Sequence, residues 1–541
     1  MALPLQEELS RANQPELTWH YVEKWASLRP EAEALVFNEQ RVTYARFQDQ
    51  MNWIAEALLE AGVECGDRVA LLSMARPEFL TTFMAANKVG AIWLGLSPKF
   101  TRDELGYLIG DSQPKVLIAL RQYGARDLGP DLEAFTREFP CLRKVLVIGE
   151  PVTGTRSFSE WVRSGRPRLR EALEERASSL TPDDEALLMY TSGSSGQPKG
   201  VLHTHKSILA NLTIQARHFE MNENTRGLLH FPINHVAADV EIGYGSIFAG
   251  GASIMMDHFD PAKTLEITGR ERVTVFGQVP AMFMLEFGVP QFPETDWSSV
   301  KSFIWSGSAA PKLVVDVVTG ITEQTGAMVL NGYGATEMAG FVTYTKRGDS
   351  HDRLLHSAGK VAEEFELRIV DNERHEVPNG TVGEIAVRGP FLMKGYYKRP
   401  DLTAQVMDAE GWYYSGDLAR QDDDGYIYIV GRKSEMFKSG GENIYPREIE
   451  AVMERFPGVL MAAVIAVSDP VFQEVGRAFV MPHPGQEVDP KTLEMHCREH
   501  LVNFKVPKYI EVRPRLPMLA NGNVDKQALK SEAAGESRNG V

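Results

Sequence analysis

The sequence predicts an α/β protein with more than one domain. Short apolar runs at residues 68–73 and 115–120 have the length of buried strands, and residues 78–89 between them have the apolar spacing of a helix. Strands and helices that alternate in this way build a mostly parallel sheet covered by helices. At 541 residues the chain also exceeds what a single hydrophobic core supports, which is about 250–300 residues.

The composition is that of an ordinary globular chain. Hydrophobic residues make up 43% and charged residues 24%, and the formal net charge of −16 is spread along the sequence. This charge disfavours nucleic acid as a partner. Residues 1–10 lack a basic region followed by an apolar stretch, and the longest apolar run, residues 459–467, is far shorter than a membrane span. We therefore expect a cytoplasmic protein without an integral membrane segment.

The cysteines suggest neither a disulfide framework nor a metal site. Cys65, Cys141 and Cys497 are far apart and lack metal-ligand spacing. We expect them to be reduced, buried thiols.

Several elements of the first half can be placed from their patterns. Residues 45–61 form an expected helix with Gly62 as its C-cap, and its apolar face consists of Phe47, Met51, Ile54 and Leu58. Residues 155–182 are rich in Arg, Glu and Ser and are expected to be a solvated connection. They lead into an expected strand at residues 185–190.

The second half predicts smaller units. Alternation at residues 365–369, with strand-like segments at 384–388 and 426–430, indicates an antiparallel sheet. After Gly431-Arg432-Lys433 the pattern restarts with a helix that Pro446 opens, which fits a C-terminal α+β domain of roughly a hundred residues. Residues 532–541 are expected to be disordered.

Residues 190–200 read Tyr-Thr-Ser-Gly-Ser-Ser-Gly-Gln-Pro-Lys-Gly directly after the strand at 185–190. Glycine lets backbone N–H groups approach phosphate oxygens, hydroxyls donate further hydrogen bonds, and Lys199 adds a positive charge. The spacing is not that of a Walker motif. A Ser/Gly-rich segment alone is more often a flexible connector, but the closing Pro-Lys-Gly favours a polyphosphate loop.

This segment resembles the signature loop of the ANL superfamily of acyl-CoA synthetases, luciferases and peptide-synthetase adenylation domains. Residues 332–337, Gly-Tyr-Gly-Ala-Thr-Glu, resemble its nucleotide-and-magnesium motif, and residues 414–417 with 431–433 resemble its ribose segment. Matches occur in the family's order from Thr43 to Lys530. The resemblance implies an AMP-forming acyl-CoA synthetase that uses a carboxylic acid, ATP, Mg²⁺ and coenzyme A, and it leaves a homodimer open.

The resemblance implies a role for individual residues around ATP. Tyr333 would lie against adenine, Thr336 would contact the α-phosphate and Glu337 would ligate Mg²⁺, although a surface glutamate in a Gly-rich turn is the alternative for Glu337. Asp417 and Arg432 would hold the ribose hydroxyls, since a carboxylate accepts two hydrogen bonds. The full implied set is Thr191, Ser192, Gly193, Ser194, Ser195, Gly196, Lys199, Gly307, Ser308, Ala309, Gly332, Tyr333, Gly334, Thr336, Asp417 and Arg432.

The implied acyl pocket has His235 at its carboxylate end, where a satisfied core histidine is the alternative. Its positions are His235, Val236, Ala237, Phe276, Gly277, Trp305, Gly307, Gly334 and Met338. This mainly apolar lining suits a small or medium aliphatic or aromatic acid. Asp239 and Glu241 follow closely. Contact with a polar group of the substrate is one interpretation of this pair, but most helical carboxylates face solvent, and we expect both to do so.

The resemblance also divides the chain into two domains. Residues 1–432 would carry the acyl and ATP sites, and residues 433–541 would rotate about Lys433-Ser434. Gly440 and Gly441 would border the tunnel for the pantetheine arm of CoA, where any Cβ narrows the passage. The alternative is a plain glycine turn before the helix that Pro446 starts.

Asn523 departs from the family pattern. The family has a Gly-Lys pair whose lysine bridges the substrate carboxylate and the α-phosphate, whereas this chain has Gly522-Asn523. A cation between two anions lowers the barrier to adenylation, and neutral Asn523 cannot supply it. Lys526 lies three residues on, and a misplacement of that size is costly. We expect adenylation to be impaired.

Three interpretations of Asn523 are open. The chain is a lysine-to-asparagine variant that stalls adenylation, a naturally slow ligase, or a paralogue that has lost the first step, and the first is favoured because the other motifs match. A stand-alone chain is expected to be a CoA ligase and not a peptide-synthetase module or a luciferase. The runner-up function is a non-catalytic protein that binds an acyl-adenylate or a nucleotide.

Overall fold

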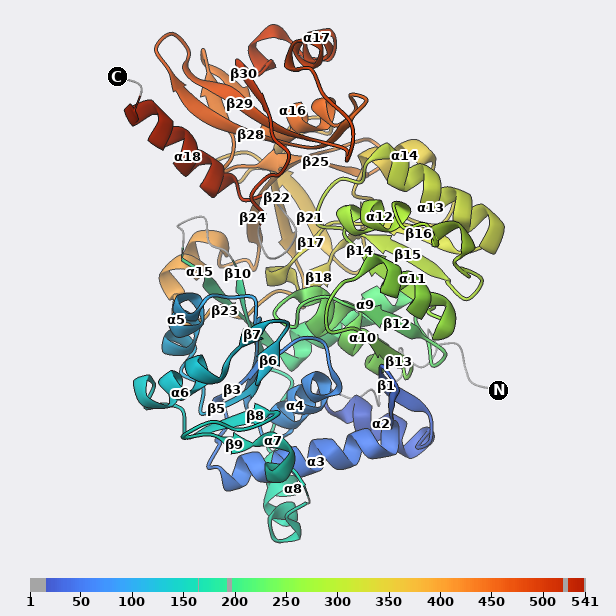
Figure 1. The fold of residues 1–541 in the computed structure, drawn as a ribbon, viewed down its shortest axis with the longest axis vertical. Coiled ribbons are helices and arrows are strands. Elements are labelled where there is room, and N and C mark those ends of the chain that lie inside the picture. The colour runs from blue at the N-terminus through green and yellow to red at the C-terminus, as the bar shows by residue number, and fades with distance from the viewer. Residues whose placement is uncertain (1–15, 164, 192–196, 519–523, 540–541) are drawn as a thin grey trace.

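The computed structural model describes residues 16–163, 165–191, 197–518 and 524–539. Two large sheets and a four-stranded sheet form most of the chain, and the elements from β26 to α18 form a smaller group beside β25 (Figure 1). This arrangement confirms the predicted α/β class. Within the described part of the chain, no helix combines the length and the apolar character needed to cross a bilayer.

The first large sheet has eight strands in the order β23-β11-β10-β4-β3-β5-β8-β9. Its parallel part runs from β10 to β9, and β11 and β23 are antiparallel additions. The strands are β3 (Arg68–Leu72), β4 (Ile92–Leu96), β5 (Val116–Leu120), β8 (Lys144–Ile148), β9 (Arg156–Ser157), β10 (Glu185–Thr191), β11 (Lys199–Thr204) and β23 (Gly395–Tyr396). The predicted strands and the predicted helix, now α4 (Pro77–Lys88), are confirmed.

The second large sheet has seven strands in the order β16-β15-β14-β12-β13-β1-β2, all parallel except β2. They are β1 (Glu33–Phe37), β2 (Gln40–Thr43), β12 (Arg226–Leu229), β13 (Ala252–Met255), β14 (Val275–Gln278), β15 (Ser302–Trp305) and β16 (Met328–Asn331). Helices accompany it: α2 (His20–Leu28), α9 (His205–His218), α10 (Gly243–Phe248), α11 (Pro261–Arg270), α12 (Pro280–Phe287) and α13 (Lys312–Thr325).

One apolar core joins the two sheets. The largest buried cluster contains Trp93 of the first sheet and Val275 of the second. Helix α3 (Tyr44–Glu60) contributes the predicted apolar face to it, and Gly62 follows the helix with φ +76°. A second cluster covers the opposite face of β14 and β15, against α12 and α13. The two sheets are therefore held by the same packed core.

The smaller sheets agree with the sequence. Strands β21 (Glu366–Val370), β22 (Gly383–Arg388), β24 (Tyr413–Gln421) and β25 (Ile427–Arg432) form the predicted antiparallel sheet. The C-terminal group is α+β, as predicted. It comprises β26 (Phe437–Ser439), β27 (Glu442–Ile444), α16 (Pro446–Met453), β28 (Val459–Asp469), β29 (Gln473–Pro482), α17 (Pro490–His500), β30 (Tyr509–Val512) and α18 (Lys526–Asn539).

Two expected irregular segments are wrong. Residues 155–182 contain β9, α7 (Phe158–Trp161) and α8 (Arg170–Ser178), and α8 buries Leu173 and Ala177 four residues apart. The tail forms α18, which packs on β28 and buries Leu529 and Ala533. In both places a polar composition concealed two apolar residues at helical spacing.

The expectation for the thiols also needs correction. Cys497 is buried, whereas Cys141 is half-buried and Cys65 is exposed. Cys65 lies in the turn between α3 and β3, where the chain reaches the surface. Only one of the three thiols is therefore a core residue.

A close backbone approach connects the first sheet to the segment that carries His235. A Cβ at Gly95, on the central strand β4, would stand 1.8 Å from the carbonyl oxygen of Ile233. No side chain fits there without moving one backbone or the other. Gly95 therefore sets how closely β4 and the His235 segment pack.

Replacing Gly95 tests whether the two backbones lie this close together. Gly95→Ala is expected to lower the free energy of unfolding by about 1–3 kcal/mol, because the methyl group displaces backbone. Urea unfolding followed by circular dichroism measures the change. Gly320→Ala is the matched control, since Gly320 lies inside α13 with nothing within 4 Å of a new Cβ. That variant is expected to gain about 0.5–1 kcal/mol. Equal stabilities of the two variants would contradict the interpretation.

Candidate functional site

The predicted phosphate loop joins β10 to β11 at one edge of the first sheet. Thr191 and Lys199 face each other across the antiparallel ladder, so the loop begins and ends at adjacent points. Ser192, Gly193, Ser194, Ser195 and Gly196 lie outside the described residues. The Lys199 ammonium lies 5.1 Å from the ring centroid of Tyr396 and forms no ion pair with a described carboxylate. Its charge is therefore available to an anion.

Glu337 contacts the hydroxyl group of Tyr396. The Tyr396 hydroxyl donates a hydrogen bond of 2.9 Å to Oε1 of Glu337, and β23, which carries Tyr396, pairs with β11. The other carboxylate oxygen of Glu337 has no described partner. Tyr396 thus brings the lysine after the phosphate loop together with the predicted metal ligand. Neither composition nor spacing had given this tyrosine a role.

His203 holds the backbone of Thr336. Its Nε2 lies 2.7 Å from the Thr336 carbonyl oxygen, and because that oxygen only accepts, Nε2 carries the hydrogen. Burial lowers the pKa of His203 to about 4, so the ring is neutral at physiological pH. Sequence reasoning missed this residue. The signal was available, since Lys199, Val201 and His203 alternate on one face of β11.

The predicted adenine and ribose residues form one hydrogen-bonded group. Tyr333 donates to Oδ2 of Asp417 at 2.7 Å, and Nε of Arg432 lies 3.0 Å from Oδ1. Asp417 and Arg432 are cross-strand neighbours on β24 and β25. Burial raises the pKa of Asp417, while Arg432 and Tyr333 oppose that rise. The carboxylate is oriented before any ligand arrives.

The remaining nucleotide residues lie where β15 and β16 end. Ser306 donates to the carbonyl of Gly332 at 3.0 Å, which connects the two strand ends. Gly307, Ser308 and Ala309 follow β15 and are exposed, and Gly307 has φ +86°. A Cβ at Gly334 would lie 2.1 Å from the Gly340 carbonyl oxygen, so the hairpin of β17 (Gly334–Ala335) and β18 (Gly340–Phe341) requires glycine there.

His235 is half-buried at the end of the segment that packs on β4. Its Nδ1 accepts from the backbone N–H of Ala237 at 3.2 Å, which leaves Nε2 as the donor. Burial lowers its pKa to about 4, so the ring is neutral. Val236, Ala237 and Met338 are buried and belong to the large core cluster.

Two residues of the implied acyl pocket lie elsewhere. Phe276 and Trp305 pack with Phe283 in the cluster against α12 and α13. A Cβ at Gly277 would face the opposite side of the sheet, toward Ile242, because successive residues of a strand face opposite sides. The structure does not bring Phe276 and Trp305 together with His235.

The expectation that Asp239 and Glu241 face solvent is wrong. Both lie in a single π-helical turn, Ala237–Glu241, with exposed fractions of 0% and 8%. Burial raises the pKa of both, to about 8 for Glu241. The helical pattern suggested a surface, but this turn lies inside the core between α9 and β18.

The C-terminal group meets the rest of the chain near Lys433. The Lys433 ammonium lies 2.9 Å from Glu384 of β22. Gly440 and Gly441, with φ +58° and +93°, form the exposed turn between β26 and β27. Asn523 lies outside the described residues. Lys526 binds the carboxylates of Glu435 and Glu450.

Residues 22–397 match the family model described as AMP-binding enzyme, and residues 448–523 match the model of the AMP-binding enzyme C-terminal domain. The chain belongs to the AMP-binding enzyme family. It is 31% identical to the putative acyl-CoA synthetase YngI of Bacillus subtilis, over 94% of this chain and 96% of that protein. It is 33% identical to the feruloyl-CoA synthase of Amycolatopsis, over 93% of this chain and 96% of that protein.

The fold also has a close structural counterpart. The crystal structure of the anthranilate CoA ligase AuaEII with anthranoyl-AMP superposes with a TM-score of 0.85 at 24% identity, covering 98% of this chain and 99% of that one. Together with the family match, these relatives make the chain an acid–thiol ligase of the acyl-CoA or aryl-CoA type that binds ATP or AMP.

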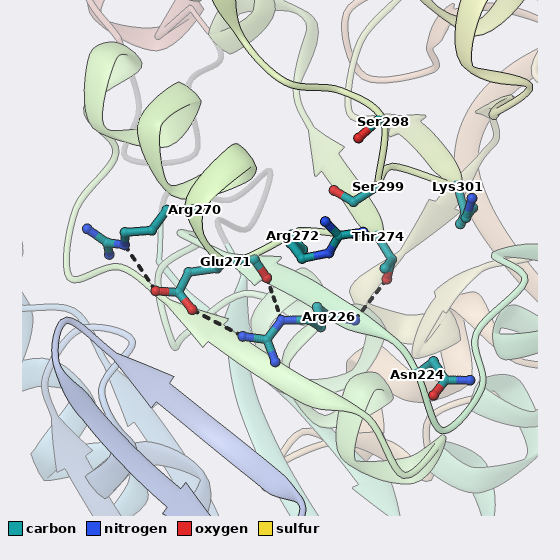
Figure 2. A pocket seen from close by; sticks show the side chains of 9 residues that line it. All are labelled: Asn224, Arg226, Arg270, Glu271, Arg272, Thr274, Ser298, Ser299 and Lys301. Atoms are coloured by element: carbon teal, nitrogen blue, oxygen red, sulfur yellow. Dashed lines mark hydrogen bonds and ion pairs between the residues drawn. The ribbon is translucent and has the colours of Figure 1, made fainter.

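This AMP-binding enzyme also has a hollow of about 380 Å³ at the opposite edge of the second sheet (Figure 2). It lies at the amino ends of β12, β14 and β15, whereas the predicted nucleotide residues follow the carboxyl ends of β15 and β16. Its lining consists of Asn224, Arg226, Arg270, Glu271, Arg272, Thr274, Ser298, Ser299 and Lys301. Arg226 and Arg270 are both paired with Glu271 across it. We do not assign it to the reaction.

His203 gives the stability a defined pH dependence. The pKa of His203 is about 4 in the folded protein and about 6.5 when unfolded, so the folded state binds fewer protons between these values. Stability is therefore lost as the pH falls from 6.5 toward 4. His203→Gln keeps a donor without a titrating group, and it should reduce this loss by about 1–3 kcal/mol.

Urea unfolding at pH 4.5 and pH 7 measures the effect. His375→Gln is the control, because the His375 side chain is exposed and forms only a surface pair with Asp371. If His203→Gln and wild type lose the same stability on acidification, the assigned role of His203 is wrong.

Proposed function

We propose that this enzyme is an AMP-forming CoA ligase for a small or medium aliphatic or aromatic carboxylic acid, with an adenylation step impaired by Asn523. The observation that carries the proposal is the meeting of three charged groups from distant parts of the sequence. The Lys199 ammonium lies over the Tyr396 ring, and the Tyr396 hydroxyl binds Glu337. Asp417 binds the hydroxyl of Tyr333, which precedes Glu337 by four residues in the sequence. A site for ATP needs a cation for the phosphates, a carboxylate for the metal and a carboxylate for the ribose, and these residues supply one of each.

In the first step the substrate carboxylate attacks the α-phosphorus of ATP, and pyrophosphate leaves. Lys199 and the loop after Thr191 bind the phosphates, and His203 positions Thr336 beside the α-phosphate. The Nε2–H of His235 is the available donor to the acid's carboxylate. Because this ring is neutral, it orients the carboxylate without neutralising it.

Glu337 suits a magnesium ion. Its second oxygen is free of described partners, and Mg²⁺ prefers one or two carboxylates together with substrate phosphates. A bound Mg²⁺ would neutralise charge on the departing pyrophosphate. Tyr396 fixes the orientation of the carboxylate that would hold it.

In the second step the CoA thiolate attacks the acyl carbonyl and AMP leaves. We infer that residues 433–541 rotate about Lys433-Ser434 for this step, while residues 1–432 keep both ligand sites. Gly440 and Gly441 would border the pantetheine tunnel. Both have positive φ angles, which favour glycine, and a Cβ at Gly441 would meet no described atom within 4 Å, so the turn is open in this conformation.

Asn523 is the weak point of the first step. The nearest cation along the sequence is Lys526, and two carboxylates hold it. Coulombic attraction to Glu450 and Glu435 raises the pKa of Lys526 against the effect of burial. Moving this ammonium to the α-phosphate would remove the 2.8 Å ion pair of the buried Glu450 and leave Arg447, at 3.7 Å, as its remaining described cation, which is unfavourable. Rescue by Lys526 is therefore disfavoured.

A non-catalytic protein that binds an acyl-adenylate is the second candidate. Only Asn523 favours it, since the contacts among Lys199, Tyr396, Glu337 and Asp417 support a site that binds ATP. The two candidates differ in whether CoA reacts, so they can be separated by experiment.

Restoring the lysine tests the impairment. Asn523→Lys is expected to raise ATP–pyrophosphate exchange by at least about a hundredfold, because a cation between carboxylate and phosphate contributes about 3 kcal/mol or more. Asn521→Lys is the matched control, since it adds the same charge two residues away. An exchange rate that stays at the wild-type level in Asn523→Lys would contradict the role assigned to this position.

Supplying the intermediate tests the second step. Wild-type protein given a synthetic acyl-adenylate and CoA is expected to form thioester and AMP at a rate that Asn523→Lys changes by less than about threefold. The reason is that Asn523 acts before the adenylate exists. Chromatography of the thioester measures the rate. If the protein binds the adenylate but forms no thioester, the ligase proposal fails and the binding protein is favoured.

A further inference from the structure

A group of hydrogen-bond acceptors lies inside the core without donors to match. It is formed by Glu241 at the end of the π-helical turn and by Gln215 and Asn211 on α9. Gln215 and Asn211 have exposed fractions of 0%, and Glu241 retains 8%. We call these three residues the acceptor pocket.

The two amides are oriented by backbone carbonyls. Nδ2 of Asn211 donates to the carbonyl of Met338, and Nε2 of Gln215 donates to that of Ala339 at 3.2 Å. A carbonyl accepts only, so these bonds fix which amide atom is the nitrogen. The oxygens Oδ1 of Asn211 and Oε1 of Gln215 then remain without a partner among the described residues.

Two of the acceptors converge on one point. Gly340 has no side chain, and the position that its Cβ would occupy lies 2.8 Å from Oε1 of Glu241 and 3.0 Å from Oε1 of Gln215. Nε2 of Gln215, which donates to the Ala339 carbonyl, lies 2.7 Å from the same point. Gly340 is paired with Ala335 of β17, beside Gly334 of the proposed acyl pocket. The acceptors thus meet at the glycine hairpin that borders the substrate.

No cation in the described chain pairs with Glu241. Its carboxyl group has no described hydrogen bond or ion pair, and burial raises its pKa to about 8, so without a ligand the group is mostly protonated at neutral pH. The nearest cation on α9, Arg217, is paired with Glu364. The neighbouring Tyr344 hydroxyl donates to the carbonyl of Phe341 at 3.0 Å. Asp239 on the same turn has two oxygens that are likewise unpartnered.

Buried polar atoms in proteins are almost always satisfied, and several unsatisfied acceptors in one place indicate a ligand that supplies donors. The His235 end of the same segment is where the proposed function puts the acid's carboxylate. The buried Val236, Ala237 and Met338 offer apolar contact for a carbon skeleton between the two ends. The segment from His235 to Glu241 therefore offers His235 to the carboxylate of the acid and Glu241 to a hydrogen-bond donor.

We propose that the acceptor pocket recognises an amino or hydroxyl group that the substrate acid carries away from its carboxylate. Each such group donates hydrogen bonds to the oxygens of Glu241 and Gln215. This inference rests on the proposed function, because it uses the acyl pocket defined by His235. An acid that ends in a methyl group leaves the acceptors unpaired, and sites built to bind a polar group reject such analogues strongly.

Binding of stable intermediate analogues tests this without requiring adenylation. The probes are acyl-sulfamoyl-adenosines whose acyl chains of four to ten atoms end in amino, hydroxyl or methyl groups. Isothermal titration of the full chain is expected to show one chain length at which the amino or hydroxyl probe binds at least tenfold more tightly than the methyl probe. The preferred length reports the distance from His235 to the acceptor pocket.

Variants of Glu241 assign the preference to this residue. Glu241→Ala is expected to abolish the preference and Glu241→Gln to keep it for hydroxyl but lose it for amino. Glu286→Gln is the matched control, because Glu286 is also buried and its pKa is also raised to about 8, but it already accepts a hydrogen bond from Gln278. This variant should keep the wild-type preference.

The outcomes separate the two proposals. If no probe binds, the adenylate site and hence the proposed function fail. If the probes bind but methyl equals amino and hydroxyl at every length, or if Glu241→Ala keeps the preference while the protein stays folded by circular dichroism, the acceptor pocket is not a recognition site. In that case the ligase proposal stands without it.

Discussion

The structure depends on hydrogen bonds and ion pairs that compensate buried carboxylates. A carboxylate removed from water is costly unless hydrogen bonds or cations compensate it. Around the nucleotide this compensation is built in: Asp417 has Tyr333 and Arg432, and Glu337 has Tyr396. These partners come from different sheets, so the pairing also fixes how the sheets meet. Glu241 lacks such a partner, and the contrast gives it significance as a position for a ligand.

The fold brings these groups together by ending strands at one place. Gly332 and Tyr333 follow β16, Ser306 follows β15, and the phosphate loop follows β10. In parallel sheets the carboxyl ends share one edge, where loops and helix starts can present polar groups. The antiparallel additions β11 and β23 then extend the first sheet toward this edge and supply Lys199 and Tyr396. Close glycine contacts, such as Gly334 with Gly340, let the backbones approach.

Much of this arrangement was predictable from sequence because local patterns encode it. Apolar runs gave β3 and β5, helical spacing gave α3, and motif order gave the family and the meeting of residues as distant as Tyr333 and Asp417. What failed depended on tertiary contacts. The tail is helical because Leu529 and Ala533 find a surface on β28, and Glu241 is buried because the core encloses its turn. Neither a propensity nor a spacing contains that information. Phe276 was expected in the acyl pocket together with its neighbour Gly277, although adjacent residues of a strand face opposite sides of the sheet.

The position of Lys526 shows why a lysine nearby is not equivalent to a lysine at position 523. Lys526 begins α18, and its ammonium joins Glu435, which follows the proposed pivot, to Glu450 of α16. It thereby connects three segments of the C-terminal group and stabilises them. A charge used in this way cannot also travel to a phosphate in the other domain. The chemistry of the first step is thus separated from the stability of the C-terminal group. Under the proposed function, asparagine at position 523 would impair adenylation while the fold and the thioester-forming half of the reaction are retained.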